Sequence, residues 1–206
     1  LLAAVESAGG RWREAPDAEL LALADGRNSG RLAGLVPLPA GPSLAELLDA
    51  PSQPVVYLVI VDVVEPGNVG ALIRTALASH AAGAICVGST DPLHPKAIRT
   101  SLGSLFKLPF VRVASSDELF EALRRRGIHS LATIARGGAP LPTAAWPRTT
   151  LALFVGNEGA GLPEPVCDAA DGRVTIDLSN EADSFSVNAA AAVCLYEVQR
   201  RLRFRA

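Results

Sequence analysis

The chain has 206 residues, enough for one domain of ordinary size or for one domain and a smaller piece. Apolar residues make up 49% of it, which excludes a wholly disordered chain, and its apolar runs are strand-sized, so no membrane span is expected. The net charge of −2 argues against a protein that binds nucleic acid through bulk charge alone.

The cysteines and histidines give no metal or disulfide pattern. Cys86, Cys167 and Cys194 are widely spaced and contain no C-x-x-C pair, and the three histidines add no ligand spacing. We therefore expect no metal, and we expect small apolar cysteines in a reducing, cytoplasmic compartment. Methionine is absent, so we also expect that residue 1 is not the natural start and that N-terminal sequence is missing.

Residues 1–54 differ from the rest of the chain. The pattern predicts a short helix at 19–24, a turn at 26–30 and a strand at 32–36. A proline-rich linker follows, with a short helix at 43–48. This segment is too small and too broken to form a stable domain by itself.

From residue 55 onward, apolar runs alternate with helical periods, which is typical of an α/β fold with a mostly parallel sheet and helices on both faces. We expect strands at 55–62, 84–88, 108–113, 128–135, 150–155 and 173–176 and helices at 69–80, 95–102, 117–126, 163–170 and 187–203. Ser115 and Glu118 form a capping-box pattern, and Gly127 fits a helix stop. Ligands of such folds bind at the carboxyl ends of the strands, so the loops after strands are the informative ones.

The first informative loop spans residues 65–76. Asn68 is predicted to cap the helix, whose apolar stripe at 69, 72, 73, 76 and 77 faces the core. Arg74 lies off that stripe, with the small residues Gly70 and Ala78 one turn away. Arg74 is therefore either open to a ligand or an ordinary surface arginine, and spacing alone leaves both open.

The second loop, at 156–163, follows an apolar strand. Its glycines permit close backbone approach to a ligand, but their G-x-x-G-x-G spacing does not match a dinucleotide-binding fingerprint, and a P-loop lysine is absent. Glu158 is unsuited to a pyrophosphate and fits a cationic or hydroxyl-bearing ligand better.

The third segment, at 176–188, opens an alanine-rich helix. Ser184, Ser186 and Asn188 place short polar groups at the helix start, where backbone donors and the helix dipole can hold a polar group. The alternative is a strong cap on a buried helix, which alone is the more common case.

Taken together and in this order, the segments resemble the SpoU (TrmH-like) methyltransferases of the SPOUT superfamily. Residues 66–76 are similar to the family pattern P-G-N-x-G-A-x-x-R-T-A, and residues 156–162 are similar to G-x-E-G-x-G-L. Residues 176–197 resemble I-P-x-x-G-x-x-x-S-L-N-V with an alanine-rich helix ending in L-Y-E, and residues 91–104 look like the family's middle segment. The likeness covers roughly residues 55–203.

The resemblance implies an S-adenosylmethionine-dependent RNA ribose 2′-O-methyltransferase, with ribosomal RNA expected ahead of transfer RNA. It implies a homodimer whose active site lies near the subunit interface, and a C-terminal trefoil knot that forms the cofactor pocket. Residues 55–206 would be the catalytic domain, and residues 1–54 the remnant of an N-terminal RNA-binding domain with its linker.

The same resemblance implies roles for single residues. The reacting side would consist of Asn68, Arg74, Glu158 and Ser184. The cofactor would contact Gly156, Ile176, Phe185 and Ser186, with Leu178 and Thr133 nearby.

The third motif departs from the family at three positions. Asp177 replaces its proline, Asn180 its glycine and Ser186 the asparagine of S-L-N, while Asn188 offers an amide two residues later on a different side of the helix start. Two other functions are alternatives. The change at Ser186 leaves open a non-catalytic RNA-binding or assembly module that keeps the fold. An ordinary nucleotide-binding α/β enzyme would need a G-x-G-x-x-G turn after its first strand, which residues 63–70 do not provide.

Overall fold

The computed structural model describes residues 1–23, 32–38, 40–49, 53–144, 146, 149–179 and 183–203. They form two compact units, Leu1–Pro39 and Ala40–Ala206. The first contains α1 (Leu2–Ser7), which we did not expect, and α2 (Asp17–Leu23), close to the short helix that we expected. The expected turn at 26–30 lies outside the described residues.

The predicted strand at 32–36 is wrong. Residues 32–38 form neither helix nor strand, and Leu32, Leu35 and Val36 are exposed. A strand needs a neighbour to receive its backbone hydrogen bonds and its apolar face, and the apolar letters of this short segment cannot supply one.

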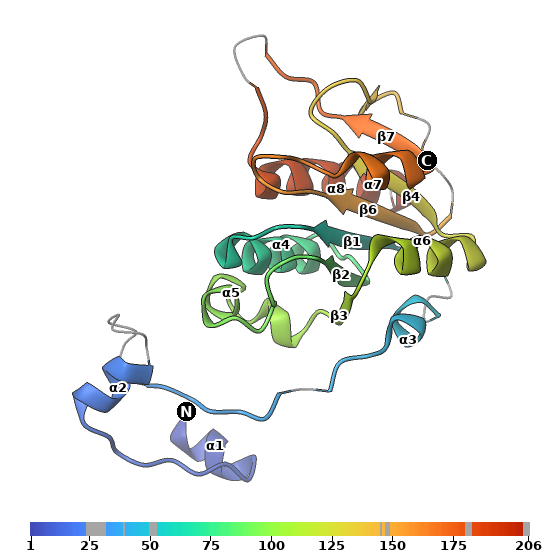
Figure 1. The fold of residues 1–206 in the computed structure, drawn as a ribbon. Helices are drawn as coiled ribbons and strands as arrows, with labels where there is room; N and C mark the ends of the chain where they lie inside the picture. The colour runs from blue at the N-terminus through green and yellow to red at the C-terminus, as the bar shows by residue number, and fades with distance from the viewer. Residues whose placement is uncertain are drawn as a thin grey trace. The chain divides into compact units, whose positions relative to one another are not determined.

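The second unit is built on a seven-stranded sheet (Figure 1). Its strands are β1 (Val56–Val61), β2 (Gly83–Val87), β3 (Phe110–Val113), β4 (His129–Thr133), β5 (Ala139–Pro140), β6 (Leu151–Val155) and β7 (Gly172–Thr175). All strand pairs are parallel, in the order β3-β2-β1-β6-β4-β7-β5. This confirms the expected parallel sheet, to which the two-residue strand β5 is an unforeseen addition.

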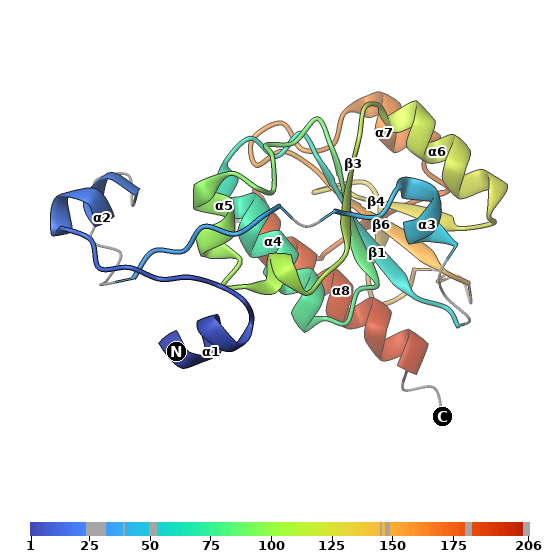
Figure 2. The same ribbon diagram turned by 90° about the horizontal axis from the view of Figure 1, so that it is seen from below.

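Helices cover both faces of the sheet, as expected. They are α3 (Leu44–Leu48), α4 (Pro66–Ala78), α5 (Pro95–Thr100), α6 (Ser116–Arg125), α7 (Glu164–Ala169) and α8 (Val187–Arg203), with a 3-10 turn η1 (Ser104–Phe106). Seen along the sheet, α4, α5 and α8 lie on one face and α3, α6 and α7 on the other (Figure 2).

The central strand β1 shows why the sequence folds in three layers. All six of its residues are buried, and they alternate between the two cores. Val56, Leu58 and Ile60 pack under α4 and α8, whereas Tyr57 and Val59 pack under α3, α6 and α7. A strand buried on both faces is a continuous apolar run, which is how it could be recognised in the sequence.

The start of α4 differs from the prediction, because Asn68 is not its cap. The helix begins at Pro66, and the Glu65 carboxylate accepts a hydrogen bond from the Gly67 backbone N–H at 2.8 Å. Proline is favoured at the first helical position because its φ is already helical and it has no N–H to satisfy. Asn68 therefore lies inside the first turn, and its side chain is available for other contacts.

Other local signals are confirmed in whole or in part. Ser115 caps α6 by accepting a hydrogen bond from the Glu118 N–H at 3.3 Å, without the reciprocal bond from the Glu118 side chain that would complete a capping box, and Gly127 follows that helix with φ +64°. The three cysteines are free and buried. Within the described ranges, no helix combines the length and apolarity that a bilayer span requires.

Helix α3 packs with the second unit, although the sequence placed it in the N-terminal segment. Leu47 and Leu48 are buried in the core shared with α6, and the Tyr57 hydroxyl donates to the Leu47 carbonyl at 2.8 Å.

The strand order brings the loops of interest to one edge. The chain runs outward through β1, β2 and β3 and then returns to the other side of β1, where β6, β4 and β7 lie next to one another. Ligands of open parallel sheets bind at the carboxyl ends near such a reversal.

Candidate active site

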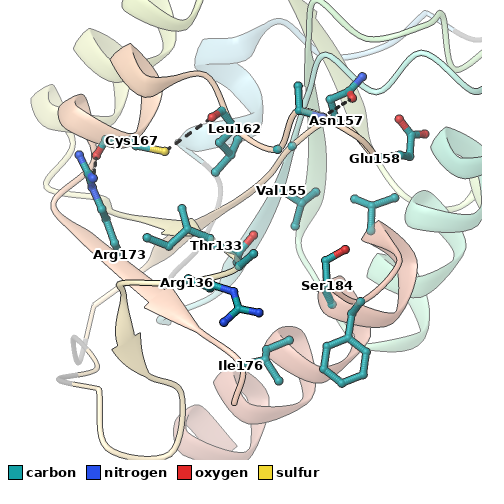
Figure 3. Close-up of a pocket in the computed structure, with 18 of the residues that line it drawn as sticks. Thr133, Arg136, Val155, Asn157, Glu158, Leu162, Cys167, Arg173, Ile176 and Ser184 are labelled. Atoms are coloured by element: carbon teal, nitrogen blue, oxygen red, sulfur yellow. Dashed lines mark hydrogen bonds between the residues drawn. The ribbon is translucent and has the colours of Figure 1, made fainter. Parts of the chain in front are cut away.

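A cavity of about 390 Å³ lies where the loops after β4, β6 and β7 meet (Figure 3). This volume is within the range of small-ligand sites, roughly 300–1,000 Å³. The lining includes Thr133 to Arg136 after β4, Val155 to Leu162 after β6, and Arg173, Val174, Ile176, Leu178, Ser184, Phe185, Val187 and Ala190 from the C-terminal part. The Gly156 turn and residues Ile176, Leu178, Ser184 and Phe185 therefore line one cavity, and their contact with a cofactor stays a prediction.

The turn after β6 folds back tightly on itself. Asn157 and Gly161 exchange two backbone hydrogen bonds, of 2.9 and 3.0 Å. A β-carbon on Gly156 would lie 2.3 Å from the Gly161 carbonyl carbon, so only glycine fits there.

The Asn157 side chain braces this turn from within, a role that the sequence reasoning missed. Its Oδ1 accepts hydrogen bonds from the N–H groups of Gly159 and Ala160, at 2.8 and 3.0 Å. Its Nδ2 donates to the Asp62 carbonyl at 3.0 Å, at the end of β1. The turn is thus fixed to the strand that leads into α4, and an asparagine inside a glycine-rich turn was the available signal.

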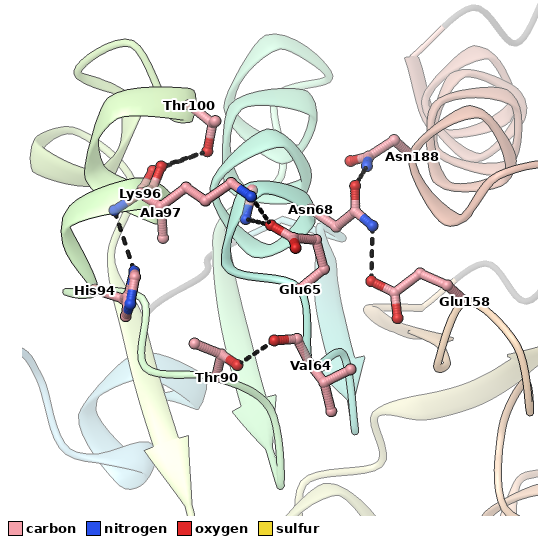
Figure 4. A network of polar contacts seen from close by, with 11 residues as sticks. Val64, Glu65, Asn68, Thr90, His94, Lys96, Ala97, Thr100, Glu158 and Asn188 are labelled. Carbon is pink, nitrogen blue, oxygen red and sulfur yellow. Dashed lines mark hydrogen bonds and ion pairs between the residues drawn. The ribbon is translucent and has the colours of Figure 1, made fainter. Parts of the chain in front are cut away.

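Glu158 projects from this turn toward α4 and α8 (Figure 4). Its Oε1 accepts a hydrogen bond from Asn68 Nδ2 at 2.7 Å, and Asn68 Oδ1 accepts one from Asn188 Nδ2 at 2.9 Å. The structure therefore unites two predicted catalytic residues, Asn68 and Glu158, with the asparagine that follows the departure at Ser186.

The segment before α8 divides its polar residues between two tasks. Ser184 and Phe185 line the cavity. Ser186 does not line it, and its hydroxyl accepts a hydrogen bond from the Ala189 N–H at 3.3 Å. The capping interpretation thus describes Ser186, while the ligand interpretation suits Ser184.

Arg74 lies apart from the cavity. It is exposed on α4 and is not among the lining residues. Seven of the ten predicted site residues line the cavity, namely Thr133, Gly156, Glu158, Ile176, Leu178, Ser184 and Phe185. Asn68 does not line it but donates to Glu158, whereas Arg74 and Ser186 are not among its lining residues.

Two arginines of the cavity were not predicted. Arg136 follows β4 and points into the cavity in Figure 3. Arg173 is held at the wall by Asp168 and by Glu164, whose Oε1 lies 3.4 Å from its Nη1. Arg136 follows the carboxyl end of β4, whereas Arg173 lies near the start of β7, so the two arginines could be assigned to one cavity only with the strand order known.

The pKa values of two side chains, one in the cavity wall and one at the start of α4, are shifted from their ordinary values. Burial raises the pKa of the Cys167 thiol, so this wall residue stays neutral. At the start of α4, a hydrogen-bonded ion pair with Lys96, 2.7 Å away, lowers the pKa of the Glu65 carboxyl. Glycine backbone, apolar side chains and the Glu158 carboxylate together suit a ligand that carries both an apolar part and a positive charge.

Comparison with known proteins gives a consistent result. The SpoU rRNA Methylase family matches residues 55–196. The chain is 34% identical over 146 residues to the 23S rRNA (guanosine(2553)-2′-O)-methyltransferase RlmP of Bacillus subtilis, covering 69% of this chain and 57% of that protein. It is 28% identical to the 23S rRNA (guanosine-2′-O-)-methyltransferase RlmB of Ralstonia nicotianae, over 97% of this chain and 81% of that protein.

A solved structure agrees with the fold. The SpoU methyltransferase AviRb of Streptomyces viridochromogenes, in complex with the cofactor AdoMet, is 30% identical with a TM-score of 0.73 and covers 79% of this chain and 65% of that one. The chain spans about half the length of several curated relatives that it matches. With the match to the family extending over most of the second unit, the chain belongs to the SpoU rRNA Methylase family.

Proposed function

We propose that this protein transfers a methyl group from S-adenosylmethionine to a ribose 2′-hydroxyl of RNA, with ribosomal RNA as the preferred substrate class and the cytoplasm as its location. The observation that carries the proposal is the cavity at the carboxyl ends of β4, β6 and β7, with Glu158 and Asn68 hydrogen bonded at its mouth. Relatives that are named as 23S rRNA 2′-O-methyltransferases support the substrate class.

The residues present fit S-adenosylmethionine. Val155, Leu162 and Ile176 offer apolar surface for the adenine, and Gly156 permits close backbone approach. The Glu158 carboxylate suits the positive charge of a sulfonium. When bound, this cofactor supplies an electrophilic methyl carbon.

The chain's own residues would position the ribose hydroxyl for in-line attack. Positioning alone can contribute about 7–11 kcal/mol when the geometry is good. Arg74 would hold the adjacent phosphate and stabilise the developing alkoxide. We do not assign it the role of a base, because an arginine guanidinium has no acceptor and keeps its proton in proteins.

In a homodimer, Arg74 would lie at an active site formed at the subunit interface. Helix α8 exposes an apolar stripe at helical spacing, made of Ala189, Ala192, Val193 and Tyr196, and Tyr196 is 70% exposed. Such a stripe on a helix next to α4 is the kind of surface that a homodimer covers. We therefore propose a homodimer in which Arg74 serves an active site at the interface.

Two further features belong to the proposal. A trefoil knot is supported by residues 141–142, where the Leu141 N–H donates to the Thr175 carbonyl at 2.8 Å and the Pro142 carbonyl accepts from Arg201 on α8. This segment thus contacts the chain both before and after residues 176–187, several of which line the pocket. Residues 1–54 would be part of an RNA-binding region, and the alignment with RlmB over 97% of the chain supports this assignment.

The test is a methyl-transfer assay with labelled S-adenosylmethionine on ribosomal and transfer RNA, followed by mapping of the modified nucleotide. We expect Arg74→Ala to reduce transfer by roughly 100-fold or more while cofactor affinity, measured by calorimetry, changes by no more than a few fold. Arg125→Ala is the matched control, since Arg125 is exposed on α6 and pairs only with Glu121 among the described residues.

Two outcomes would contradict the proposal. Loss of cofactor binding in Arg74→Ala would place that residue in the pocket and not on the reacting side. Binding of the cofactor without transfer to any RNA, or no binding at all, would favour the non-catalytic module that the change at Ser186 keeps open.

A further inference from the structure

Three side chains from separate segments form a chain of hydrogen bonds beside the pocket. Asn188 Nδ2, in the first turn of α8, donates to Asn68 Oδ1 on α4 at 2.9 Å, and Asn68 Nδ2 donates to Glu158 Oε1 at 2.7 Å (Figure 4). The segments are 90 and 120 residues apart in sequence, so only the fold brings them together.

The chemistry of the groups fixes the direction of this chain. An ionised carboxylate can only accept hydrogen bonds, so Asn68 must turn its amide NH₂ toward Glu158. Its oxygen then faces Asn188 and requires a donor, which the Asn188 amide supplies. Every donor in the chain therefore points toward Glu158.

This arrangement leaves one group without a partner. Asn188 Oδ1 is buried, and it has no hydrogen-bond partner among the described residues. A buried unpaired oxygen costs about 1–3 kcal/mol, and such groups in folded proteins call for an explanation such as a functional role. The Asn188 side chain therefore has an orientation in which its NH₂ group donates to Asn68 while its own oxygen stays without a hydrogen bond.

Glu158 needs this support because of where it lies. It is exposed on a turn that contains Gly156, Gly159 and Gly161, and a free glutamate side chain at such a site samples several rotamers. Asn68 restricts it to one orientation, and Asn188 restricts Asn68 in turn.

We propose that Asn188 is a positioning residue for methyl transfer, which holds the Glu158 carboxylate at the pocket mouth through Asn68. The inference rests on the proposed function. It goes beyond that function by giving a role to a residue that does not line the cavity and reaches Glu158 only through Asn68.

The experiment compares Asn188→Ala with Gln199→Ala in single-turnover methyl transfer. Gln199 is the matched control, because it is also on α8 and its side-chain amide also donates a hydrogen bond to another segment, the His80 carbonyl, at 3.1 Å. It lies at the other end of the helix, away from Glu158. We expect Asn188→Ala to slow transfer about tenfold, as small misplacements at active sites do, while the cofactor Kd stays within about twofold. The Tm of Asn188→Ala should stay within about 2 °C of the wild-type value or rise, since the substitution also removes the buried, unpaired Asn188 oxygen.

A double-mutant cycle then tests the route through Asn68. In the Asn68→Ala background, Asn188→Ala should slow transfer by less than about twofold, because the two residues act in series. The same tenfold loss in both backgrounds, a Tm that falls in step with the rate, or a cofactor Kd raised tenfold would each overturn the positioning role. A wild-type chain that transfers no methyl group would instead overturn the proposed function and this inference with it.

Discussion

At Gly156, backbone meets backbone at a distance that excludes a side chain. The carbonyl carbon and oxygen of Gly161 would lie 2.3 and 2.4 Å from an added β-carbon, and neither atom can move without opening the hydrogen-bonded turn. Gly159, in the same turn, has much more room, since an added β-carbon would meet only Asn157 Oδ1 at 3.7 Å. The two glycines have identical letters and different physical roles.

This difference gives a paired prediction. Gly156→Ala should weaken S-adenosylmethionine binding by at least tenfold, because the turn at 156–161 must open to make room for the alanine side chain. Gly159→Ala should keep the affinity within a few fold. Calorimetric titration of both variants is the measurement, and equal affinities would show that the close approach at Gly156 is not required.

Residue types at the site could be predicted more readily than their contacts. Glu158, Ser184 and Phe185 were assigned from motif letters, and all three line the cavity. The partner of Glu158 could not be assigned, since Asn68 also fits a helix cap and only the position of Pro66 excludes that role. Arg136 escaped notice because nothing in its local sequence indicates that β4 ends beside β7.

Among the elements, α4 and α5 pack with no room to spare. A β-carbon on Gly70 would lie 2.1 Å from the Ala97 carbonyl oxygen and 2.2 Å from Thr100 Oγ1. Alanine is a better helix former than glycine by about 1 kcal/mol. Helix propensity therefore predicts that Gly70→Ala stabilises the protein, whereas packing predicts that it destabilises the protein.

We predict that packing prevails at Gly70. Gly70→Ala should lower the free energy of unfolding by about 1–3 kcal/mol, the usual cost of overpacking. Chemical denaturation of this variant and of Ala71→Gly, on the neighbouring half-buried position, is the measurement. A gain in stability at Gly70 would mean that α5 can move away freely.

The last turns of α8 contain a pH-sensitive ion pair. Hydrogen bonds from Arg200, at 2.8 and 2.9 Å, and from Arg201 lower the pKa of Glu197 from 4.5 to about 2, against the opposing effect of burial. Because the folded-state pKa is depressed, the stabilisation is complete above about pH 4.5 and is lost as the pH falls toward 2.

The predicted consequence is a difference between two pH profiles of stability. The free energy of unfolding of the wild type should fall relative to that of Glu197→Gln between about pH 4.5 and 2, by an amount on the order of 1 kcal/mol because the arginines remain accessible to water. Parallel profiles of the two proteins across that range would contradict the assignment to Glu197.

At the scale of the whole molecule, α8 carries an apolar stripe of Ala189, Ala192, Val193 and Tyr196 that is exposed in the single chain. Val193 and Tyr196 are 40% and 70% exposed on a helix whose other face is buried in the core. Apolar side chains at this spacing are typical of a surface that another protein surface covers.

Self-association is the expected result. Sedimentation equilibrium should give a dimer for the wild type and a monomer for Tyr196→Glu, because a charge in a covered apolar interface is strongly unfavourable. Arg125→Glu, exposed on α6, is the control and should stay dimeric. A wild type that is monomeric at micromolar concentration would remove the proposed interface and the role of Arg74 in it.

By itself, the sequence determined the alternation of strands and helices, because burial on both faces of a parallel sheet imposes apolar runs that can be read locally. It also determined the residue types at the pocket, since a tight turn requires glycine and a helix start favours short polar groups. The tertiary structure alone decided that β6 and β4 insert between β1 and β7, that Asn157 and Asn188 brace the site, and that residues 32–36 have no strand partner. Those features depend on which distant segments become neighbours, and neither periodicity nor local propensity carries that information.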